Sequence, residues 1–271
     1  MRPCHPWVVE DLEKARARRW WQTRTHLGRI DRAARFISDV GFCLLFPKTG
    51  IELPSLWEAA SDRPLMDAVE AWSGPDIDRV WQWKDELPRC GLAWYGEFVR
   101  GRKSFLSPQL LSDLYPRRGH PTDFTDAPLS DEARKIARIL LRSGPQSTAA
   151  LREALAIEGS RGAERFNRAR GELGRALVVT GYGTEEEGTG WPAGVLELTA
   201  RAFPIARKRH LEASRLRAAR QFLDTMIVAL PRDLGNAFGW GATTARRALE
   251  ELVGRGDAER VGPAFRLPGA G

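Results

Sequence analysis

The amino-acid sequence predicts a mostly α-helical fold with small β-hairpins, organised as tandem winged-helix units, which are variants of the helix-turn-helix motif. Two observations predict this fold. Amphipathic helical stripes recur along the chain, and an order of three helices followed by two strand-like runs occurs twice in its C-terminal half. Because the chain has 271 residues and domains usually contain about 100 to 150, we expect two or three compact units.

Residues 129–204 show this order most clearly. A helix over 130–142 carries a continuous apolar stripe and begins at Ser130, its expected N-cap. A shorter helix follows the break GPQST, with Thr148 as its expected cap, and the stretch 159–176 forms a third helix. The runs LVVTGYG and VLELTAR then predict two strands. Three helices followed by a hairpin are the order of a winged helix.

The same order returns near the C-terminus. Residues 215–230 predict a first helix, PRDLGNAFG a short second helix that begins at Pro231, and WGATTARRALEELVGRG a third that ends near Gly254. The short runs DAERV and AFRL predict the two strands. The two segments share the order of their predicted elements rather than their amino-acid sequence. This repeated order favours tandem units.

The first third of the chain is less regular. Its patterns predict several helices, the short apolar run GFCLLFP, two strands with a turn at 100–103, and a closing helix SPQLLSDLYP. Residues 117–128, RRGHPTDFTDAP, are polar and Pro-rich and indicate a linker. We therefore expect an N-terminal winged-helix-like domain over residues 1–120, a second winged-helix domain over 121–204 and a C-terminal winged-helix domain over 205–271.

The composition favours an acidic partner. The formal net charge is +7 and the pI about 9.8. The basic excess lies at the two ends, with 9 basic and 4 acidic side chains in residues 1–35 and 12 and 7 in residues 205–271. Such a balance favours nucleic acid or anionic lipid. Since the chain has no apolar run of about 18 residues and no apolar signal-peptide core, we expect no membrane association and a cytoplasmic location.

Metal and cofactor motifs are not found. Cys4, Cys43 and Cys90 are scattered without a CxxC pair, and the four histidines lack metal-ligand spacing. The sequence contains no P-loop, dinucleotide fingerprint or nucleophile elbow. We expect neither a metal site nor a cofactor.

The stretch GSRGAERFNRARGELGRA, residues 159–176, carries a basic helical face. When Phe166 and Leu173 face the core, the arginines at 161, 165, 168 and 175 fall on the opposite side. A winged helix places its third helix in the major groove, so we expect Arg161, Arg165, Arg168 and Arg175 to contact DNA. The alternative is a solvated face with ion pairs from Arg168 to Glu164 and Glu172, worth about 0.3 to 0.5 kcal/mol each.

The corresponding helix of the last unit begins with a second set of candidates. Thr243 and Thr244 supply hydroxyls, and Arg246 and Arg247 supply guanidinium groups. Short hydroxyls and arginines at a helix start suit phosphate oxygens and the helix dipole, so we expect all four to bind DNA. The alternative is a threonine N-cap with ordinary surface charge.

Residues 81–88, WQWKDELP, are the most unusual short stretch. Lys84 lies beside Asp85 and Glu86, and tryptophans precede it. Such a group can supply an amine nucleophile or a carboxylate base in an aromatic pocket, so these three are the candidate catalytic residues. The alternative is a helix end with its tryptophans packed inward and its charges in water.

The serial winged-helix order, the run from Phe36 to Pro47 that contains GFCLLFP, and the WQWKDELP to WYG stretch together resemble one family. The chain is similar to the AlkZ-like (YcaQ-like) winged-helix DNA glycosylases, and especially to their shorter AlkZ-related members. The resemblance implies tandem winged helices that form a concave DNA-binding surface, and in the full family the excision of alkylated or crosslinked bases. It also implies a Gln-hydrophobic-Gln or Gln-hydrophobic-Asp motif, whose positions here are Leu44, Leu45 and Phe46. Leucine and phenylalanine can neither stabilise a sugar cation nor orient water.

The sequence therefore predicts a winged-helix protein that binds double-stranded DNA, is related to DNA-repair glycosylases and lacks their catalytic motif. One alternative is an active DNA glycosylase that excises alkylated bases with relocated catalytic residues. Another is a protein-binding adaptor, because winged helices also dock proteins. The sequence makes no prediction of the oligomeric state.

Overall fold

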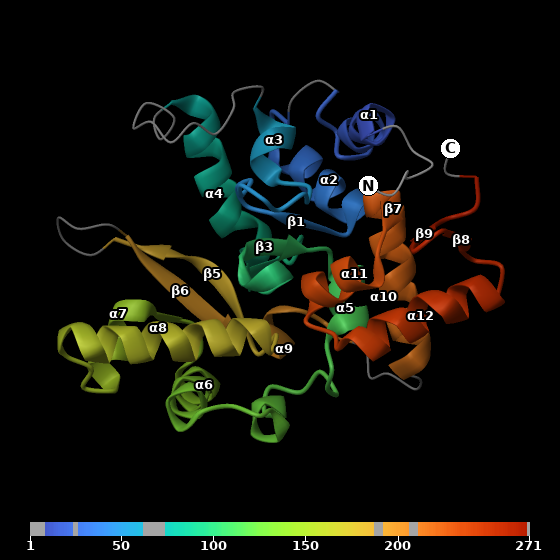
Figure 1. The fold of residues 1–271 in the computed structure, drawn as a ribbon. Coiled ribbons are helices and arrows are strands. Elements are labelled where there is room, and N and C mark those ends of the chain that lie inside the picture. The colour runs from blue at the N-terminus through green and yellow to red at the C-terminus, as the bar shows by residue number, and fades with distance from the viewer. Residues whose placement is uncertain (1–8, 24–26, 62–73, 187–191, 206–210, 270–271) are drawn as a thin grey trace.

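The computed structural model describes residues 9–23, 27–61, 74–186, 192–205 and 211–269, and these form three small sheets surrounded by helices (Figure 1). We refer to the parts of the chain around the three sheets as the first, second and third units. The predicted fold class, mostly helical with small β-hairpins, is confirmed. No helix within these ranges combines the length and apolar character that crossing a bilayer requires.

The first part of the chain contains the first unit, an N-terminal helix before it and a short helix after it. Its elements are α1 (Val9–Arg19), α2 (Ile30–Val40), β1 (Phe42–Leu44), α3 (Leu56–Ala60), α4 (Pro75–Arg89), β2 (Trp94–Glu97), the 3-10 turn η2 (Val99–Gly101), β3 (Lys103–Leu106) and α5 (Pro108–Leu114). One of the several helices that the sequence predicts in this third of the chain, LMDAVEAW, lies outside the described residues. The WQWKDELP stretch forms the C-terminal half of α4.

The second and third units contain the two predicted repeats. The second consists of η3 (Asp123–Asp126), α6 (Asp131–Ser143), β4 (Gln146–Ser147), α7 (Thr148–Ala154), α8 (Gly159–Arg175), β5 (Val179–Glu185), β6 (Ala193–Leu198) and α9 (Thr199–Ala202). The third consists of α10 (Leu211–Met226), β7 (Val228–Ala229), α11 (Pro231–Phe238), α12 (Ala242–Gly254), β8 (Glu259–Val261) and β9 (Ala264–Arg266).

All three units have the same topology. Each runs helix, strand, helix, helix, strand, strand, starting at α2, α6 and α10. In each antiparallel sheet the third strand lies in the centre, in the orders β1-β3-β2, β4-β6-β5 and β7-β9-β8. This is the element order predicted for a winged helix, with a short strand added after the first helix. The third helices of the three units are therefore α4, α8 and α12.

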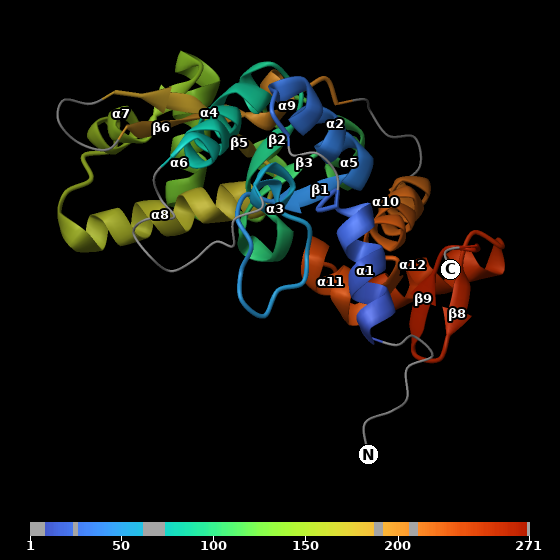
Figure 2. The same cartoon turned by 90° about the horizontal axis from the view of Figure 1, so that it is seen from above.

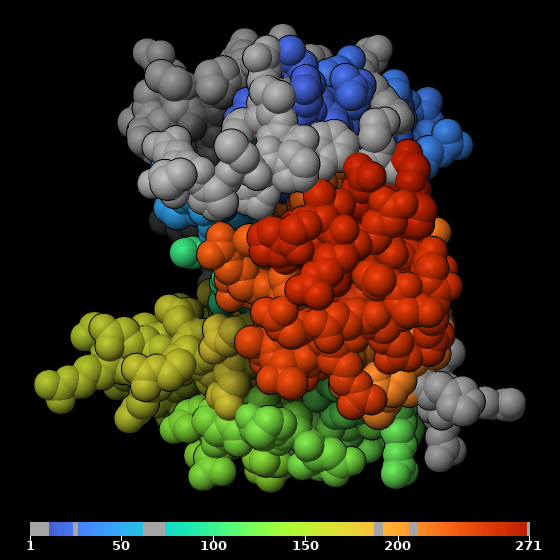
Figure 3. All heavy atoms as spheres, turned by 45° about the vertical axis from the view of Figure 1, so that its right-hand side comes forward, coloured from blue at the N-terminus to red at the C-terminus, as the bar shows by residue number. Residues whose placement is uncertain are grey.

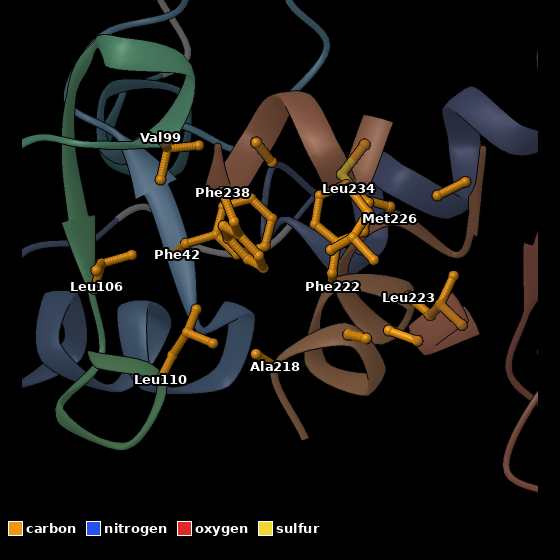
Figure 4. Close-up of a cluster of buried hydrophobic side chains, with 14 of the residues drawn as sticks. Phe42, Val99, Leu106, Leu110, Ala218, Phe222, Leu223, Met226, Leu234 and Phe238 are labelled. Carbon is orange, nitrogen blue, oxygen red and sulfur yellow. The ribbon is translucent and has the colours of Figure 1, made fainter. Parts of the chain in front are cut away.

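The first and third units share one hydrophobic core. The ring of Phe222 on α10 stacks on Phe42 of β1 with centroids 5.6 Å apart, and Phe238 of α11 meets both rings edge-on (Figure 4). Seen from above, the sheet of the first unit lies between the second unit on one side and α10 to α12 on the other (Figure 2). The division into domains 1–120, 121–204 and 205–271 stays a prediction.

The N-terminal tryptophans belong to the body of the protein. Trp20 is buried and donates its indole N–H to the Thr225 carbonyl at 2.8 Å. Trp21 packs edge-on against Phe36 with centroids 5.9 Å apart. Arg19, the last residue of α1, pairs with the carboxylates of Asp39 and Asp224. The basic and aromatic residues around Trp20 and Trp21 could in principle grip nucleic acid, but these contacts show that they pack within the protein.

Two local predictions were wrong. The segment 117–128 is packed rather than an open linker, because Phe124 is buried and the Asp123 carboxylate accepts hydrogen bonds from two backbone N–H groups at 2.7 and 2.9 Å. The N-cap of α7 is Ser147, not Thr148, and its hydroxyl accepts from the Ala150 N–H at 3.2 Å. Ser130 caps α6 as predicted.

Candidate functional site

A cavity of about 470 Å³ lies between the first and second units. From the first unit it is lined by the end of β1 with the residues that follow, by α4, and by β2 and β3. From the second unit it is lined by α8 and by the two long strands β5 and β6. Because the walls come from both units, the cavity exists only while the units are docked.

The two units approach closely at β2 and β5. The buried hydroxyl of Thr180 bonds to both the backbone N–H and the carbonyl of Tyr95, each at 3.2 Å. A Cβ at Gly181 would lie 2.7 Å from the Tyr95 ring, and a Cβ at Gly174 would lie 3.2 Å from the Glu97 nitrogen. Glycine at these positions lets the second unit lie directly against the edge of the first sheet.

One polar group in the cavity joins α4 to β5. The Lys84 ammonium donates to the Asp85 carboxylate at 2.5 Å, and the Thr184 hydroxyl donates to the other oxygen of that carboxylate at 2.9 Å. Lys84 is only 8% exposed, and its Nζ lies 5.3 Å from the Trp81 ring centroid. Asp85 is thus held at the cavity wall by two donors. Glu86 is not among the lining residues, because its carboxylate accepts from Gln82 on the outer side of α4.

A second polar group joins β2, β3 and α8. The Glu97 carboxylate lies 2.9 Å from the Lys103 ammonium and 3.4 Å from the Arg170 guanidinium. Burial raises the pKa of Glu97, but Lys103, Arg170 and Arg175 together outweigh it and hold that pKa below its usual range. Burial, then the charge of Arg170 and that of Lys84, lowers the pKa of Lys103 although Glu97 acts in the opposite direction.

Aromatic rings complete the wall. Phe46 meets Trp81 edge-on with centroids 5.7 Å apart. The Tyr95 ring lies between two amines, 6.0 Å from Lys84 Nζ and 5.9 Å from Lys103 Nζ. Burial and the negative charge of Asp85 raise the pKa of the Tyr95 phenol, so it stays protonated. The cavity therefore combines aromatic rings with a small number of charged groups, as ligand sites commonly do.

The positions to which the resemblance assigned the catalytic motif also line this cavity. Leu44 and Leu45 are buried, and Phe46 is half-buried. They offer only hydrocarbon and aromatic surface. Lys48 follows them in the same segment, and the other charged side chains that line the cavity come from α4, β2, β3 and α8 or lie beside these elements. Sequence reasoning found Lys84 and Asp85 but missed Glu97, Lys103 and Arg170.

The predicted arginine face of α8 is accessible. Arg161, Arg165, Arg168 and Arg175 are all exposed. The second unit projects from the body of the molecule, and its yellow-green start of α8 stands free at the left of Figure 3. The alternative explanation expected an ion pair between Arg168 and Glu172. The Glu172 carboxylate instead accepts hydrogen bonds from the N–H and the hydroxyl of Ser130, at 2.7 and 2.6 Å.

The candidates on α12 lie at the helix start. Thr243, Arg246 and Arg247 are exposed, and Thr244 is half-buried. The N-cap is Gly241, so the alternative explanation of a threonine cap is wrong. A second cavity of about 500 Å³ lies where the units meet, and Arg100, Arg175 and Asn236 line it. The C-terminal end of α8, η2 and α11 all contribute to its lining.

Three small sheets of one topology, each surrounded by helices, define the class as a mostly helical fold of three serial units. The chain belongs to the AlkZ-related family, whose model matches residues 27–237. The structure of the Streptomyces sahachiroi DNA glycosylase AlkZ is similar with a TM-score of 0.54, covering 97% of this chain and 70% of that one. The sequence identity is 11%, so this likeness concerns the fold. No curated protein matches the sequence.

Proposed function

We propose that this chain is a winged-helix protein that binds double-stranded DNA, related in function to DNA-repair glycosylases. The observation that carries the proposal is the face of α8, where Arg161, Arg165, Arg168 and Arg175 are exposed on the third helix of a unit. Guanidinium groups bind phosphate through a planar fork, and third helices of this motif enter the major groove. Membership of the AlkZ-related family supports the same substrate.

The third unit adds a second contact region. Its third helix α12 starts with exposed Thr243, Arg246 and Arg247, and an N-terminal helix end attracts phosphate. Arg100 and Arg175 line the cavity between α8 and α11. A duplex that crosses from α8 to the third unit would therefore meet basic side chains along its path.

Reversing two charges on α8 tests the interface. In the double variant Arg165→Glu, Arg168→Glu, affinity for a duplex oligonucleotide is expected to fall by about tenfold or more. The slope of the logarithm of affinity against the logarithm of salt concentration should become shallower by about two, because each lost phosphate contact removes about 0.9. Fluorescence anisotropy over a salt series measures both quantities.

The control places the same charge change on another helix. Arg138 and Arg142 are exposed on α6, the first helix of the same unit. The double variant Arg138→Glu, Arg142→Glu is expected to change affinity less than threefold. Equal losses in both variants would mean that only net charge matters, and a flat salt response of the wild type would favour the protein-binding adaptor instead.

A second candidate function is base excision in the cavity. The observation that favours it is the position of Asp85, whose carboxylate lines the same cavity as Leu44 to Phe46. A carboxylate held by Lys84 and Thr184 can orient water or stabilise a sugar cation, which the apolar motif positions cannot. In this candidate function the catalytic carboxylate lies on α4, whereas the resemblance places the catalytic motif at the end of β1.

Release of free base from alkylated duplex DNA tests this candidate. If the carboxylate of Asp85 acts, Asp85→Asn is expected to lower the release rate by about 100-fold. Glu86→Gln is the matched control, since Glu86 is adjacent in sequence but bonded to Gln82 outside the cavity. Release that is equal in the two variants would exclude Asp85, and no release from any alkylated duplex would leave DNA binding alone.

A further inference from the structure

Lys103 is an amine that neither function above uses. It stands at the start of β3 and lines the cavity between the first and second units. Its side chain is 43% exposed, whereas the side chain of Lys84 is 10% exposed and hydrogen-bonded to Asp85. Of these two amines, Lys103 is the one that an incoming molecule can reach.

The surroundings of Lys103 make its ammonium easier to deprotonate than that of an ordinary lysine. Arg170 and Lys84 act on it from two other elements, and the lowered pKa described above follows from burial and these cations. Desolvation and a neighbouring cation are the two features that activate a lysine as a nucleophile. The neighbouring Glu97 carboxylate, 2.9 Å from Nζ, is an ionised proton acceptor.

We propose that Lys103 Nζ forms an imine with an aldehyde, and that the aldehyde is the ring-opened sugar of an abasic site in DNA. The choice of this aldehyde rests on the proposed DNA binding. An abasic sugar lies between two phosphates, and Arg170, Arg102 and Lys48 line the same cavity as cations for those phosphates. The aromatic faces of Trp81 and Phe46 are suited to stack on a base beside the gap.

The chemistry balances without a further reagent. The ammonium of Lys103 gives a proton to Glu97, and the nitrogen lone pair attacks the aldehyde carbon while the C=O π electrons move to oxygen. That oxygen takes up one of the two protons that the nitrogen now carries as a cation, which gives a neutral carbinolamine. Glu97 returns its proton to the hydroxyl, which leaves as water while the nitrogen lone pair forms the C=N bond. The sum is ammonium plus aldehyde to iminium, the protonated imine, plus water.

Reductive trapping tests the proposal. The full chain is incubated with a duplex that contains one abasic site, in the presence of sodium cyanoborohydride, which reduces an imine to a stable amine. A covalent protein–DNA band is expected on a denaturing gel, and peptide mass spectrometry should place the adduct on Lys103. The mapping uses the wild-type chain, so it does not depend on how a variant folds.

Two conservative variants sharpen the test. Lys103→Arg keeps the positive charge but removes the amine, and it is expected to lower the trapped fraction about 20-fold or more. Lys135→Arg is the control, since Lys135 is exposed on α6 and is not among the residues that line the cavity. It should trap as well as the wild type. Affinity for undamaged duplex should stay within about twofold in both variants.

The two kinds of failure can be told apart. If the chain binds undamaged duplex but forms no adduct, or forms one at another lysine, the inference about Lys103 is overturned and the proposed DNA binding stands. If the chain does not bind undamaged duplex at low salt, the proposed function is overturned, and the abasic-site substrate with it.

Discussion

Replacing Phe222 with alanine is expected to lower the free energy of unfolding by about 3 to 5 kcal/mol. The side chain is fully buried between the first and third units, stacked on Phe42 and in edge contact with Phe238 (Figure 4). Truncation removes the contacts of the ring and leaves a void that backbone elements from both units surround. The substitution also removes two ring pairs, Phe222 with Phe42 and Phe222 with Phe238, each worth about 0.5 to 1.5 kcal/mol beyond burial.

Urea denaturation followed by tryptophan fluorescence measures this loss. Leu211→Ala is the control on the same helix, because Leu211 is 57% exposed and its truncation is expected to cost less than about 0.5 kcal/mol. A cost for Phe222→Ala no larger than for Leu211→Ala would contradict the shared core. The variant is further expected to show a separate early transition, since the third unit is packed on the first through this cluster.

The sequence predicted the fold where the pattern was local. Amphipathic stripes and caps located α6, α8, α10 and α12, because helical periodicity is set by neighbouring residues. The first strands of the second and third units, β4 and β7, have two residues each, and such short strands carry no periodic signal. The first unit was harder still, because a long connection separates its first strand β1 from α3 and hides the common topology.

The candidate site was predicted only in part, because it is assembled across units. Lys84 and Asp85 lie in the unusual stretch WQWKDELP, and this pattern made them candidates. Glu97, Lys103 and Arg170 have no comparable pattern around them in the sequence. One signal was present but was not used. Gly171 and Gly174 follow Arg170 within the last five residues of α8, still inside the helix, where glycine is unfavourable. Such glycines indicate that another part of the chain approaches closely.

The error in segment 117–128 has a similar cause. Its proline-rich, polar composition is typical of a linker. The composition conceals that one carboxylate, Asp123, binds the preceding backbone N–H groups of Gly119 and His120, while Phe124 enters the core of the second unit. Polar residues that organise their own backbone cannot be distinguished by composition from those that face water.

The close approach at Gly174 leads to the second large effect. Gly174→Val is expected to destabilise the protein by about 1 to 3 kcal/mol, although replacing a helical glycine usually stabilises. A Cβ at this position would lie 3.2 Å from the Glu97 nitrogen and 3.3 Å from the Glu97 oxygen, and both are backbone atoms that cannot rotate away. The two further carbons of valine must displace α8 from β2, so overpacking exceeds the gain in helix propensity.

The same substitution at an open position separates these two contributions. Gly254 ends α12, and a Cβ added there would meet no atom within 4 Å, so Gly254→Val is expected to change the free energy of unfolding by less than about 0.5 kcal/mol. Displacement of α8 also moves Arg170 away from Glu97 and Lys103, which removes one of the cations that lowers the pKa of Lys103. Gly174→Val should therefore also slow trapping of abasic DNA at neutral pH. An unfolding free energy equal to that of the wild type would show that the contact between α8 and β2 tolerates a side chain, and that the cavity does not depend on it.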